Sequence, residues 1–281
     1  MADLRFTPTK HFHATGGMAV LDTVQLEDGR LAVLRKYRVS RLLNFRLRAQ
    51  FIAGLRLRQE LSGHQNIVGS LGFSEGLLPY EIIEFVSGPN LNTIMGRQDD
   101  FFKKYRVQIL QQAAEALAWI HRHKVMHLDV KPENFLVRVA AEGPLVKLTD
   151  FDLARAADDN GPGRRNGTPE YMAPEQFKQK MRYQASDVFA FSIMAYRMLA
   201  NRFPFSGSSA NSALKHQASD KVTARPLHEV CPDVPARLEI AIMHGLEKDW
   251  HRRLQDMNAF LQEWGVGSGM PQNSGKRKAV F

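Results

Sequence analysis

The 281-residue chain has little of what a secreted or membrane protein needs. Its one cysteine, Cys231, cannot form an internal disulfide, which excludes a small disulfide-stapled fold. The most apolar stretch, residues 188–200, contains Arg197 and is shorter than the roughly 20 apolar residues that cross a bilayer. The first ten residues lack the apolar core of a signal peptide. We therefore expect a soluble, cytoplasmic protein.

Acidic residues are absent from the segment 30–59, although the chain contains 29 of them. The basic residues of this segment are Arg30, Arg35, Lys36, Arg38, Arg41, Arg46, Arg48, Arg56 and Arg58. Such a stripe can bind an acidic partner or nucleic acid, and it can also be a solvated helix face. Because no nucleic-acid-binding motif accompanies the stripe, the sequence favours a solvated face, leaves an acidic partner open and disfavours nucleic acid.

Apolar residues make up 44% of the chain and charged residues 24%, close to the averages of globular proteins. This excludes disorder, collagen and coiled coil for most of the chain. The tail, residues 265–281, is rich in glycine, polar and basic, and we expect it to be disordered. The remaining residues, 1–264, are enough for one large domain or two closely joined lobes.

The first third of the chain is expected to form strands with one helix, and the rest is expected to form long helices with two short strands between them. Helices are indicated by apolar residues at steps of three and four, or by a proline-free run rich in Leu, Arg and Gln. The expected strands are 31–34, 80–86, 135–139 and 145–149, and the expected helices are 39–61, 102–120 and 188–198. This order predicts an α+β fold with a small β-rich lobe on a larger α-helical lobe.

The strongest chemical signal is the segment 127–134, HLDVKPEN, followed by Asp150-Phe151-Asp152 at the end of an expected strand. Phosphoryl transfer to a hydroxyl needs a carboxylate that receives the proton, a cation near the γ-phosphate and Mg²⁺ on the phosphates. One loop supplies Asp129, Lys131 and Asn134 for these tasks. Asp150 adds the anionic oxygen that Mg²⁺ prefers.

Together with the segment 167–175, GTPEYMAPE, these motifs resemble eukaryotic-type (Hanks-type) Ser/Thr protein kinase domains. The resemblance covers about residues 10–264. It implies a two-lobed kinase fold, with an N-lobe over about 10–85 and a C-lobe over about 88–264. It also implies ATP and Mg²⁺ as cofactors in the cleft and a protein substrate.

The resemblance also implies a role for each matching residue. Asp129 would be the catalytic base and Lys131 the cation at the γ-phosphate, with Thr168 in contact with both. Asn134 and Asp150 would hold Mg²⁺. The residues expected to bind ATP are Gly16, Gly17, Leu21, Val33, Arg35, Glu84, Val86 and Leu136. In addition, Glu175 would pair with Arg253, and Asp187 would brace the catalytic loop.

The N-terminal part departs from the family pattern. The glycine-rich loop has alanine at 14 and 19 where outer glycines are usual, which is a mild loss where φ is negative and a serious one where φ is positive. Arg35 stands where a lysine is usual, and a register shift would place Leu34 or Lys36 there. Gly54, or Leu55, stands where a helix glutamate normally pairs with that lysine. Arg35 is therefore expected to lack an acid and to contact the nucleotide phosphates directly.

Two further departures concern regulation. Leu128 replaces the arginine that pairs with a phosphorylated activation loop, and residues 153–167 contain no Ser, Thr or Tyr. We therefore expect activity without phosphorylation of that loop. Asp152 replaces a usual glycine and is expected to restrict movement of its segment.

Several alternatives remain at this stage. A pseudokinase would have the same fold without turnover, in keeping with Arg35 and Gly54. A small-molecule phosphotransferase would share the acidic residues but would not need the segment 167–175. The histidines at 121, 123 and 127 could suggest zinc, but no cysteine or acid completes a ligand set. Cys231 is expected to be a packed or surface thiol.

Overall fold

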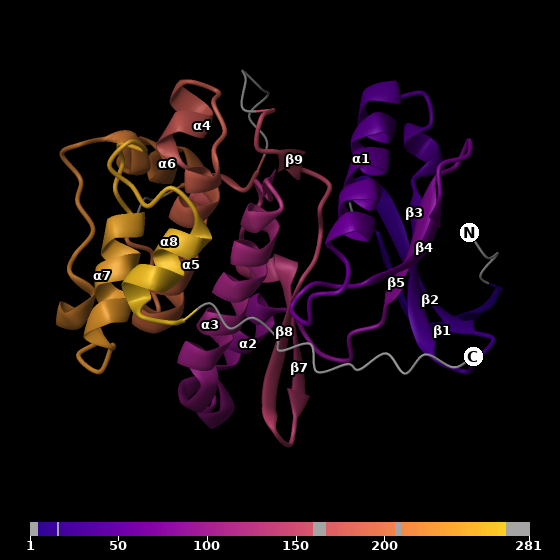
Figure 1. The fold of residues 1–281 in the computed structure, drawn as a ribbon, viewed down its shortest axis with the longest axis horizontal. Coiled ribbons are helices and arrows are strands. Elements are labelled where there is room, and N and C mark those ends of the chain that lie inside the picture. The colour runs from indigo at the N-terminus through magenta and orange to yellow at the C-terminus, as the bar shows by residue number, and fades with distance from the viewer. Residues whose placement is uncertain (1–4, 16, 160–166, 206–208, 268–281) are drawn as a thin grey trace, which may run out of the picture.

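The computed structural model describes residues 5–15, 17–159, 167–205 and 209–267. Within them the chain forms two lobes side by side, with most of the β-structure on the right of Figure 1 and most helices on the left. The predicted α+β, two-lobed architecture is confirmed. The expected disordered tail lies mainly beyond residue 267, outside the described residues.

The N-lobe is a five-stranded antiparallel sheet with the order β1-β2-β3-β5-β4. Its strands are β1 (Phe6–Thr15), β2 (Ala19–Leu26), β3 (Leu31–Tyr37), β4 (Ser70–Ser74) and β5 (Tyr80–Glu84). The first strand begins a few residues before the expected lobe boundary near residue 10. The central strand β3 pairs with β2 on one side and β5 on the other, so its side chains are among the most buried of the sheet.

Helix α1 (Phe45–Leu61) packs against the sheet. The expected helix began at residue 39, but the chain first forms a short 3₁₀ turn, η1 (Val39–Arg41). The later start has a local cause, because the Asn44 side chain accepts a hydrogen bond from the Leu47 backbone N–H at 3.1 Å and so caps α1. Phe51 and Leu55 of α1 are fully buried in one apolar cluster with Tyr37 of β3.

The C-lobe is built around two long helices, α3 (Asp100–Arg122) and α5 (Gln184–Ala200), which confirm the predicted periodicity. Nearly all of α5 is buried, since other helices surround it. The remaining helices are α2 (Leu91–Arg97), α4 (Pro174–Lys178), α6 (Ala210–Ala218), α7 (Ala236–Gly245) and α8 (Met257–Trp264), with 3₁₀ turns η2 (Pro132–Asn134), η3 (Pro169–Tyr171) and η4 (Leu227–Glu229).

Two small antiparallel sheets lie next to the cleft between the lobes. The hairpin β7 (Phe135–Ala140) and β8 (Gly143–Leu148) contains the two strands that the sequence predicted. The second sheet pairs β6 (Val125–Met126) with β9 (Arg155–Ala156). Because the segment 127–134 runs from β6 to β7 and Asp150 follows β8, these pairings bring both motifs to the same edge of the cleft.

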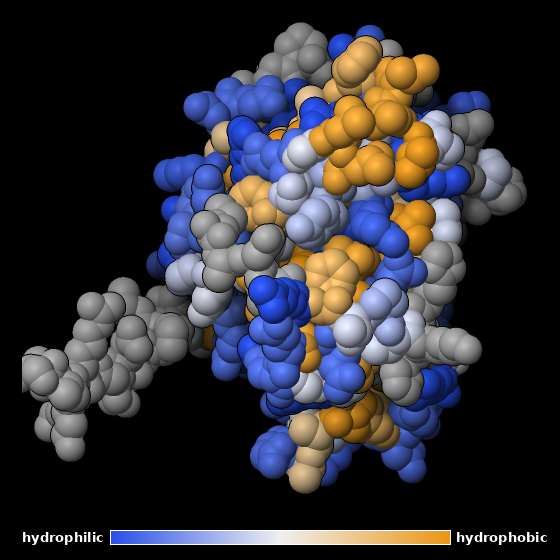
Figure 2. Space-filling model, turned by 90° about the vertical axis from the view of Figure 1, so that its right-hand side faces the viewer, coloured by the Kyte–Doolittle hydropathy of each residue, from blue (hydrophilic) through white to orange (hydrophobic). Residues whose placement is uncertain are grey.

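Figure 2 views the N-lobe end of the molecule, where hydrophobic side chains gather near the top among hydrophilic ones. The large apolar residues exposed in the N-lobe are Leu31, Val39, Leu43, Phe45, Leu77 and Leu78. Among the described residues, no helix has the length and apolar character that crossing a membrane requires.

Candidate active site

The catalytic-loop backbone is held by Asp187 of α5. Its carboxylate accepts hydrogen bonds from the backbone N–H of His127 at 2.6 Å and of Leu128 at 2.7 Å. Leu128 has φ +65°, a conformation that is costly for a leucine. Both N–H groups are buried with the carboxylate, so the ionic hydrogen bonds offset this strain. The brace that the sequence predicted for Asp187 is present.

Four polar side chains meet on this loop. The Lys131 ammonium lies 2.7 Å from Asp129 Oδ2 and donates to Thr168 Oγ1 at 2.9 Å. The Thr168 hydroxyl donates to Asp129 Oδ1 at 3.1 Å, and Asn134 Nδ2 donates to the Asp129 backbone carbonyl at 2.8 Å. The predicted contact of Thr168 with both other residues is therefore present. Because Asn134 Nδ2 also donates to Asp129 Oδ2 at 3.2 Å, the Asp129 carboxylate is fixed from three sides.

A cavity of about 540 Å³ opens beside this cluster between the two lobes. The predicted ATP-binding residues that line it are Gly17, Leu21, Val33, Arg35, Glu84, Val86 and Leu136, together with the predicted metal ligands Asn134 and Asp150. Gly16 lies outside the described residues. The volume and the mixture of apolar walls with a few polar groups are typical of cofactor pockets.

Oxygen donors suited to Mg²⁺ face this cavity. Asn134 uses its Nδ2 to hold Asp129, and its Oδ1 accepts no hydrogen bond from the described residues. Burial would raise the pKa of Asp150, but the charges of Arg35, His127 and Arg58 and a hydrogen bond from the Asp152 backbone together outweigh it, and the pKa lies below its ordinary value. An ionised carboxylate and an amide oxygen on one wall fit a hard divalent cation.

The alanines of the glycine-rich loop are accommodated without strain. Ala14 pairs with Leu21 in the sheet and Ala19 begins β2, and neither has a positive φ. The milder of the two outcomes expected for these substitutions therefore applies.

The register of β3 places Arg35, and not its neighbours, in the cleft. Lys36 points to the other face and lies 2.7 Å from Asp22, and Leu34 packs in an apolar cluster of the sheet. The expectation that Arg35 lacks an acid is wrong. Its Nη1 donates to Glu81 Oε1 at 2.8 Å, and its Nη2 donates to Asp152. Burial would lower the pKa of Arg35, but the charges of Asp152, Glu81 and Asp150 raise it above the ordinary value.

Gly54, where a helix carboxylate was expected, faces the backbone of Phe151 and Asp152, and no side chain fits there. A Cβ on Gly54 would stand 2.9 Å from the backbone oxygen of Phe151. One helical turn later, Arg58 reaches into the same region, where its Nε donates to Glu81 Oε2 at 3.1 Å. The ion pair has therefore been rearranged, with the cation on the helix and the acid on the sheet.

Sequence reasoning missed Glu81 and Arg58. Glu81 is in a predicted strand, and its position directly opposite Arg35 follows from the pairing of β3 with β5. The signal that could have found it is the pair of charged residues, Glu81 and Glu84, within the otherwise apolar and aromatic run 80–86. A strand with both faces buried rarely contains an unpaired carboxylate.

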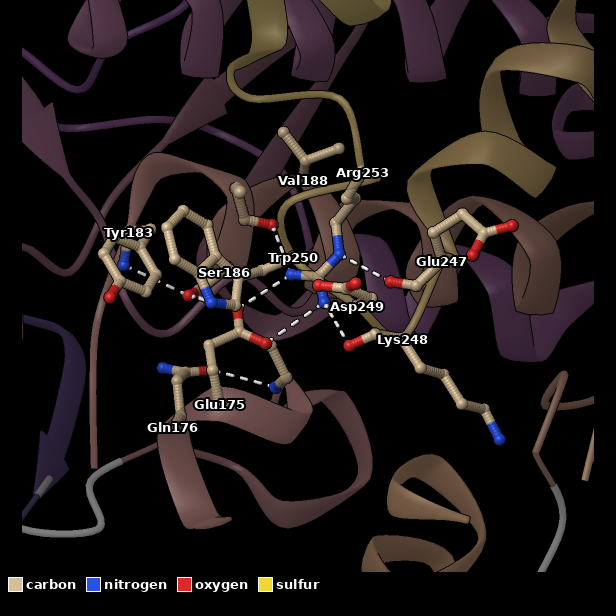
Figure 3. A network of polar contacts seen from close by, with 12 residues as sticks. Glu175, Gln176, Tyr183, Ser186, Val188, Glu247, Lys248, Asp249, Trp250 and Arg253 are labelled. Carbon is tan, nitrogen blue, oxygen red and sulfur yellow. Dashed lines mark hydrogen bonds and ion pairs between the residues drawn. The ribbon is translucent and has the colours of Figure 1, made fainter. Parts of the chain in front are cut away.

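The predicted ion pair between Glu175 and Arg253 anchors the C-terminal end of the segment 167–175 (Figure 3). Arg253 donates through Nη1 to Glu175 Oε1 at 2.8 Å and through Nη2 to Glu175 Oε2 at 3.1 Å. Its other donors bind the backbone carbonyls of Ala185, Glu247 and Lys248, so the buried guanidinium is fully satisfied.

The basic stripe of residues 30–59 is only partly a solvated face. Arg35 and Arg58 are buried in the pairs described above. At the surface, Arg56 donates to Glu75 at 2.6 Å, and Arg30 and Lys36 pair with Asp28 and Asp22. Acids from other segments thus neutralise charges that seem unopposed along the chain. An acidic partner for the remaining arginines stays a prediction.

The three histidines considered for zinc use their rings for other contacts. His121 meets Asp187 and the Met257 N–H, His123 meets the Trp119 carbonyl, and His127 meets the Thr149 carbonyl. Cys231 is buried in the C-lobe core, in keeping with a packed thiol.

Comparison with known proteins gives the family. A family model described as "Protein kinase domain" matches residues 16–264. The serine/threonine-protein kinase Pkn1 of Myxococcus xanthus is 35% identical over 207 residues, which are 71% of this chain and 29% of Pkn1. PrkC of Bacillus subtilis is 31% identical over 71% of this chain and 31% of its own length, and PknB of Mycobacterium tuberculosis is 30% identical over 83% and 37%. The chain belongs to the protein kinase domain family.

The chain spans about a third of the length of the curated relatives it matches. These relatives are named serine/threonine-protein kinases, and such names give no support to the pseudokinase alternative. The family match over residues 16–264 likewise favours a protein kinase over a small-molecule phosphotransferase.

Proposed function

We propose that this chain transfers the γ-phosphoryl group of Mg-ATP to serine or threonine hydroxyls of a protein substrate. The observation that carries the proposal is the cluster of Asp129, Lys131 and Thr168, which is joined to the cleft cavity through Asn134. It joins a candidate base, a cation and the substrate-positioning segment within hydrogen-bonding distance. The names of the bacterial relatives support serine and threonine as acceptors.

In this mechanism Asp129 receives the proton of the attacking hydroxyl. Its carboxylate can do so in one orientation because Thr168 holds Oδ1 and Lys131 lies at Oδ2. The Lys131 ammonium also offsets charge on the transferred group. Asn134 and Asp150 would hold Mg²⁺, which neutralises phosphate charge when bound.

The nucleotide base is proposed to bind where β5 leaves the N-lobe. The Glu84 side chain is turned away from this position, because its Oε1 accepts from Gly69 N at 2.8 Å and from Lys147 Nζ at 2.6 Å. The backbone of Glu84 and Val86 is then the edge available to adenine. The adenine ring would lie between Leu136 on one side and Leu21 and Val33 on the other.

The test is phosphoryl transfer from Mg-ATP to a generic basic protein substrate. Asp129→Asn should keep nucleotide binding and lose at least ~10²-fold in rate, the usual contribution of a positioned base. The matched control is Asp233→Asn, the same chemical change at an exposed C-lobe site, which should leave the rate unchanged. Equal rates for the wild type and Asp129→Asn would contradict the assignment.

A further inference from the structure

Glu81 is the only described residue whose carboxylate holds two guanidinium groups in the N-lobe. Its Oε1 accepts from Arg35 of β3 at 2.8 Å, and its Oε2 accepts from Arg58 of α1 at 3.1 Å. The side chain is fully buried, and Arg58 is 1% exposed. One acid on β5 thus connects the central strand of the sheet to the helix.

The buried charges around Glu81 are balanced. Arg35 and Arg58 contribute two positive charges, and Glu81 and Asp152 contribute two negative ones. Asp150, which is more exposed, lies 3.9 Å from Arg35. Removal of the Glu81 charge would leave two buried arginines with a single buried acid, which is strongly unfavourable.

The two sides of the Arg35 guanidinium face different surroundings. Nη1 is directed into the protein toward Glu81, and Nη2 is directed toward Asp152 and Asp150, both of which line the cleft cavity. Because Glu81 lies directly opposite Arg35 in the β3–β5 ladder, its bond fixes how the guanidinium enters the cavity. The Phe51 ring, 4.7 Å from the guanidinium, packs against it.

No helix acid can take over this task. The Cβ of any residue at position 54 would meet the Phe151 backbone oxygen at 2.9 Å. That space is filled by the segment that follows β8, and Arg58 lies 5.1 Å over the Phe151 ring. The helix therefore contributes a cation, and only the sheet supplies an acid on the buried side of Arg35.

We propose that Glu81 is a positioning residue that orients Arg35 toward the nucleotide phosphates and replaces the missing helix carboxylate. The inference rests on the proposed kinase function for its link to turnover. Independently of turnover, Glu81 is expected to affect the affinity for Mg-ADP through Arg35. Glu81 itself does not line the cavity, so its effect on the reaction passes through Arg35.

The experiment compares two double variants of the full chain that have the same buried net charge. Glu81→Gln with Arg58→Met keeps Arg35, whereas Glu81→Gln with Arg35→Met keeps Arg58. Both remove one acid and one cation, so both are expected to fold even if Glu81→Gln alone does not. Turnover with Mg-ATP and calorimetric affinity for Mg-ADP are measured for each, beside the single variants Arg35→Met and Arg58→Met.

Glu81→Gln is expected to lower turnover by ~10- to 100-fold, the scale of a misplaced catalytic group. The loss should persist in the Arg58→Met background. In the Arg35→Met background, Glu81→Gln should change turnover and affinity by less than about threefold, because coupled residues are not additive. Glu81→Asp, which keeps the charge, should recover part of the activity.

Three outcomes would overturn the inference. An equal effect of Glu81→Gln with and without Arg35 would mean that Glu81 acts independently of it. Full turnover in Glu81→Gln with Arg58→Met would mean that Glu81 only balances Arg58. A wild type that binds Mg-ADP but transfers no phosphate would refute the proposed function but not the role of Glu81. The effect of Glu81→Gln on the affinity for Mg-ADP, measured with and without Arg35, would then decide that role. A wild type that binds no nucleotide would refute both.

Discussion

The backbone oxygen of Phe151 lies 2.9 Å from the point that a Cβ on Gly54 would occupy. Real Cβ atoms essentially never come this close to a backbone oxygen, and the oxygen cannot move without moving the segment 150–152. Gln50, one turn earlier on α1, donates to the Asp152 backbone carbonyl at 2.9 Å. Helix α1 therefore sits directly on the segment that contains the predicted metal ligand Asp150.

A methyl group at position 54 is expected to disturb this contact. Gly54→Ala should lower the free energy of unfolding by up to about 2 kcal/mol, because overpacking exceeds the gain in helix propensity. The control is Gly96→Ala in α2, where nothing lies within 4 Å of the added Cβ. The free energy of unfolding of that variant, measured by urea denaturation, should rise by about 0.5–1 kcal/mol. A gain of the same size at Gly54 would contradict the packing argument.

For the same reason, Arg35→Lys combined with Gly54→Glu should not restore an ordinary kinase ion pair. The glutamate would have to displace the Phe151 backbone before it could reach the lysine. We expect the double variant to be less active than Arg35→Lys alone in a turnover assay. Higher turnover in the double variant would show that α1 can retreat from its contact without loss.

Removal of Arg253 should be severe. Arg253→Met leaves the Glu175 carboxylate buried with the Ser186 hydroxyl, at 2.7 Å, but without its cation. Such a change costs about 3–5 kcal/mol of unfolding free energy. The neighbouring Arg252 is exposed, and Arg252→Met should change the same quantity by less than ~0.5 kcal/mol. Similar losses for the two variants, measured by chemical denaturation, would refute the difference.

Phosphorylation near the activation loop is not expected to activate the protein. Residues 153–167 contain no hydroxyl side chain, Thr168 is bonded to Asp129 and Lys131, and the buried Tyr171 hydroxyl accepts from Arg197 at 2.6 Å. Phosphate on either hydroxyl would break these contacts. Leu128, which replaces the usual arginine and is buried, offers no cation to pair with such a phosphate. Phosphatase treatment should therefore leave turnover within about twofold. An activating phosphate mapped by mass spectrometry to Thr168 or Tyr171 would oppose this.

His64 should make the protein less stable in mild acid. Burial, with the nearby charges of Arg122 and Lys147, lowers the pKa of His64 to about 4, and its Nδ1 accepts the Asn66 N–H at 3.2 Å, which requires the unprotonated nitrogen. In the unfolded chain the pKa is ordinary, about 6.5. The unfolded chain thus binds more protons between about pH 4 and 6.5, and the free energy of unfolding falls as the pH falls through this window.

The comparison is between the wild type and His64→Asn, whose side-chain oxygen can still accept from Asn66. From pH 7 to pH 5 the wild type should lose roughly 1 kcal/mol more than the variant, a modest amount because the ring is only partly buried. Chemical denaturation at both pH values measures the difference. An NMR titration that gives the imidazole a pKa near 6.5 would contradict the assignment.

The sequence by itself determined the catalytic loop and most of the framework. Asp129, Lys131 and Asn134 lie within six residues, so one local backbone conformation brings them together. The long helices α3 and α5 could be predicted from apolar residues at steps of three and four, although α5 is buried on almost all sides. The pairs Glu175–Arg253 and Asp187–His127 could be predicted because the motifs that contain them are recognisable along the chain.

Only the tertiary structure decided how Arg35 is partnered. Glu81 is 46 residues away and Asp152 is 117 residues away, and neither belongs to the helix in which an acid was sought. The contact with Glu81 depends on the register of β3 against β5, and the absence of a helix carboxylate depends on how closely α1 approaches Phe151. Strand register and helix approach are set by packing over the whole lobe, and local residue patterns do not encode them.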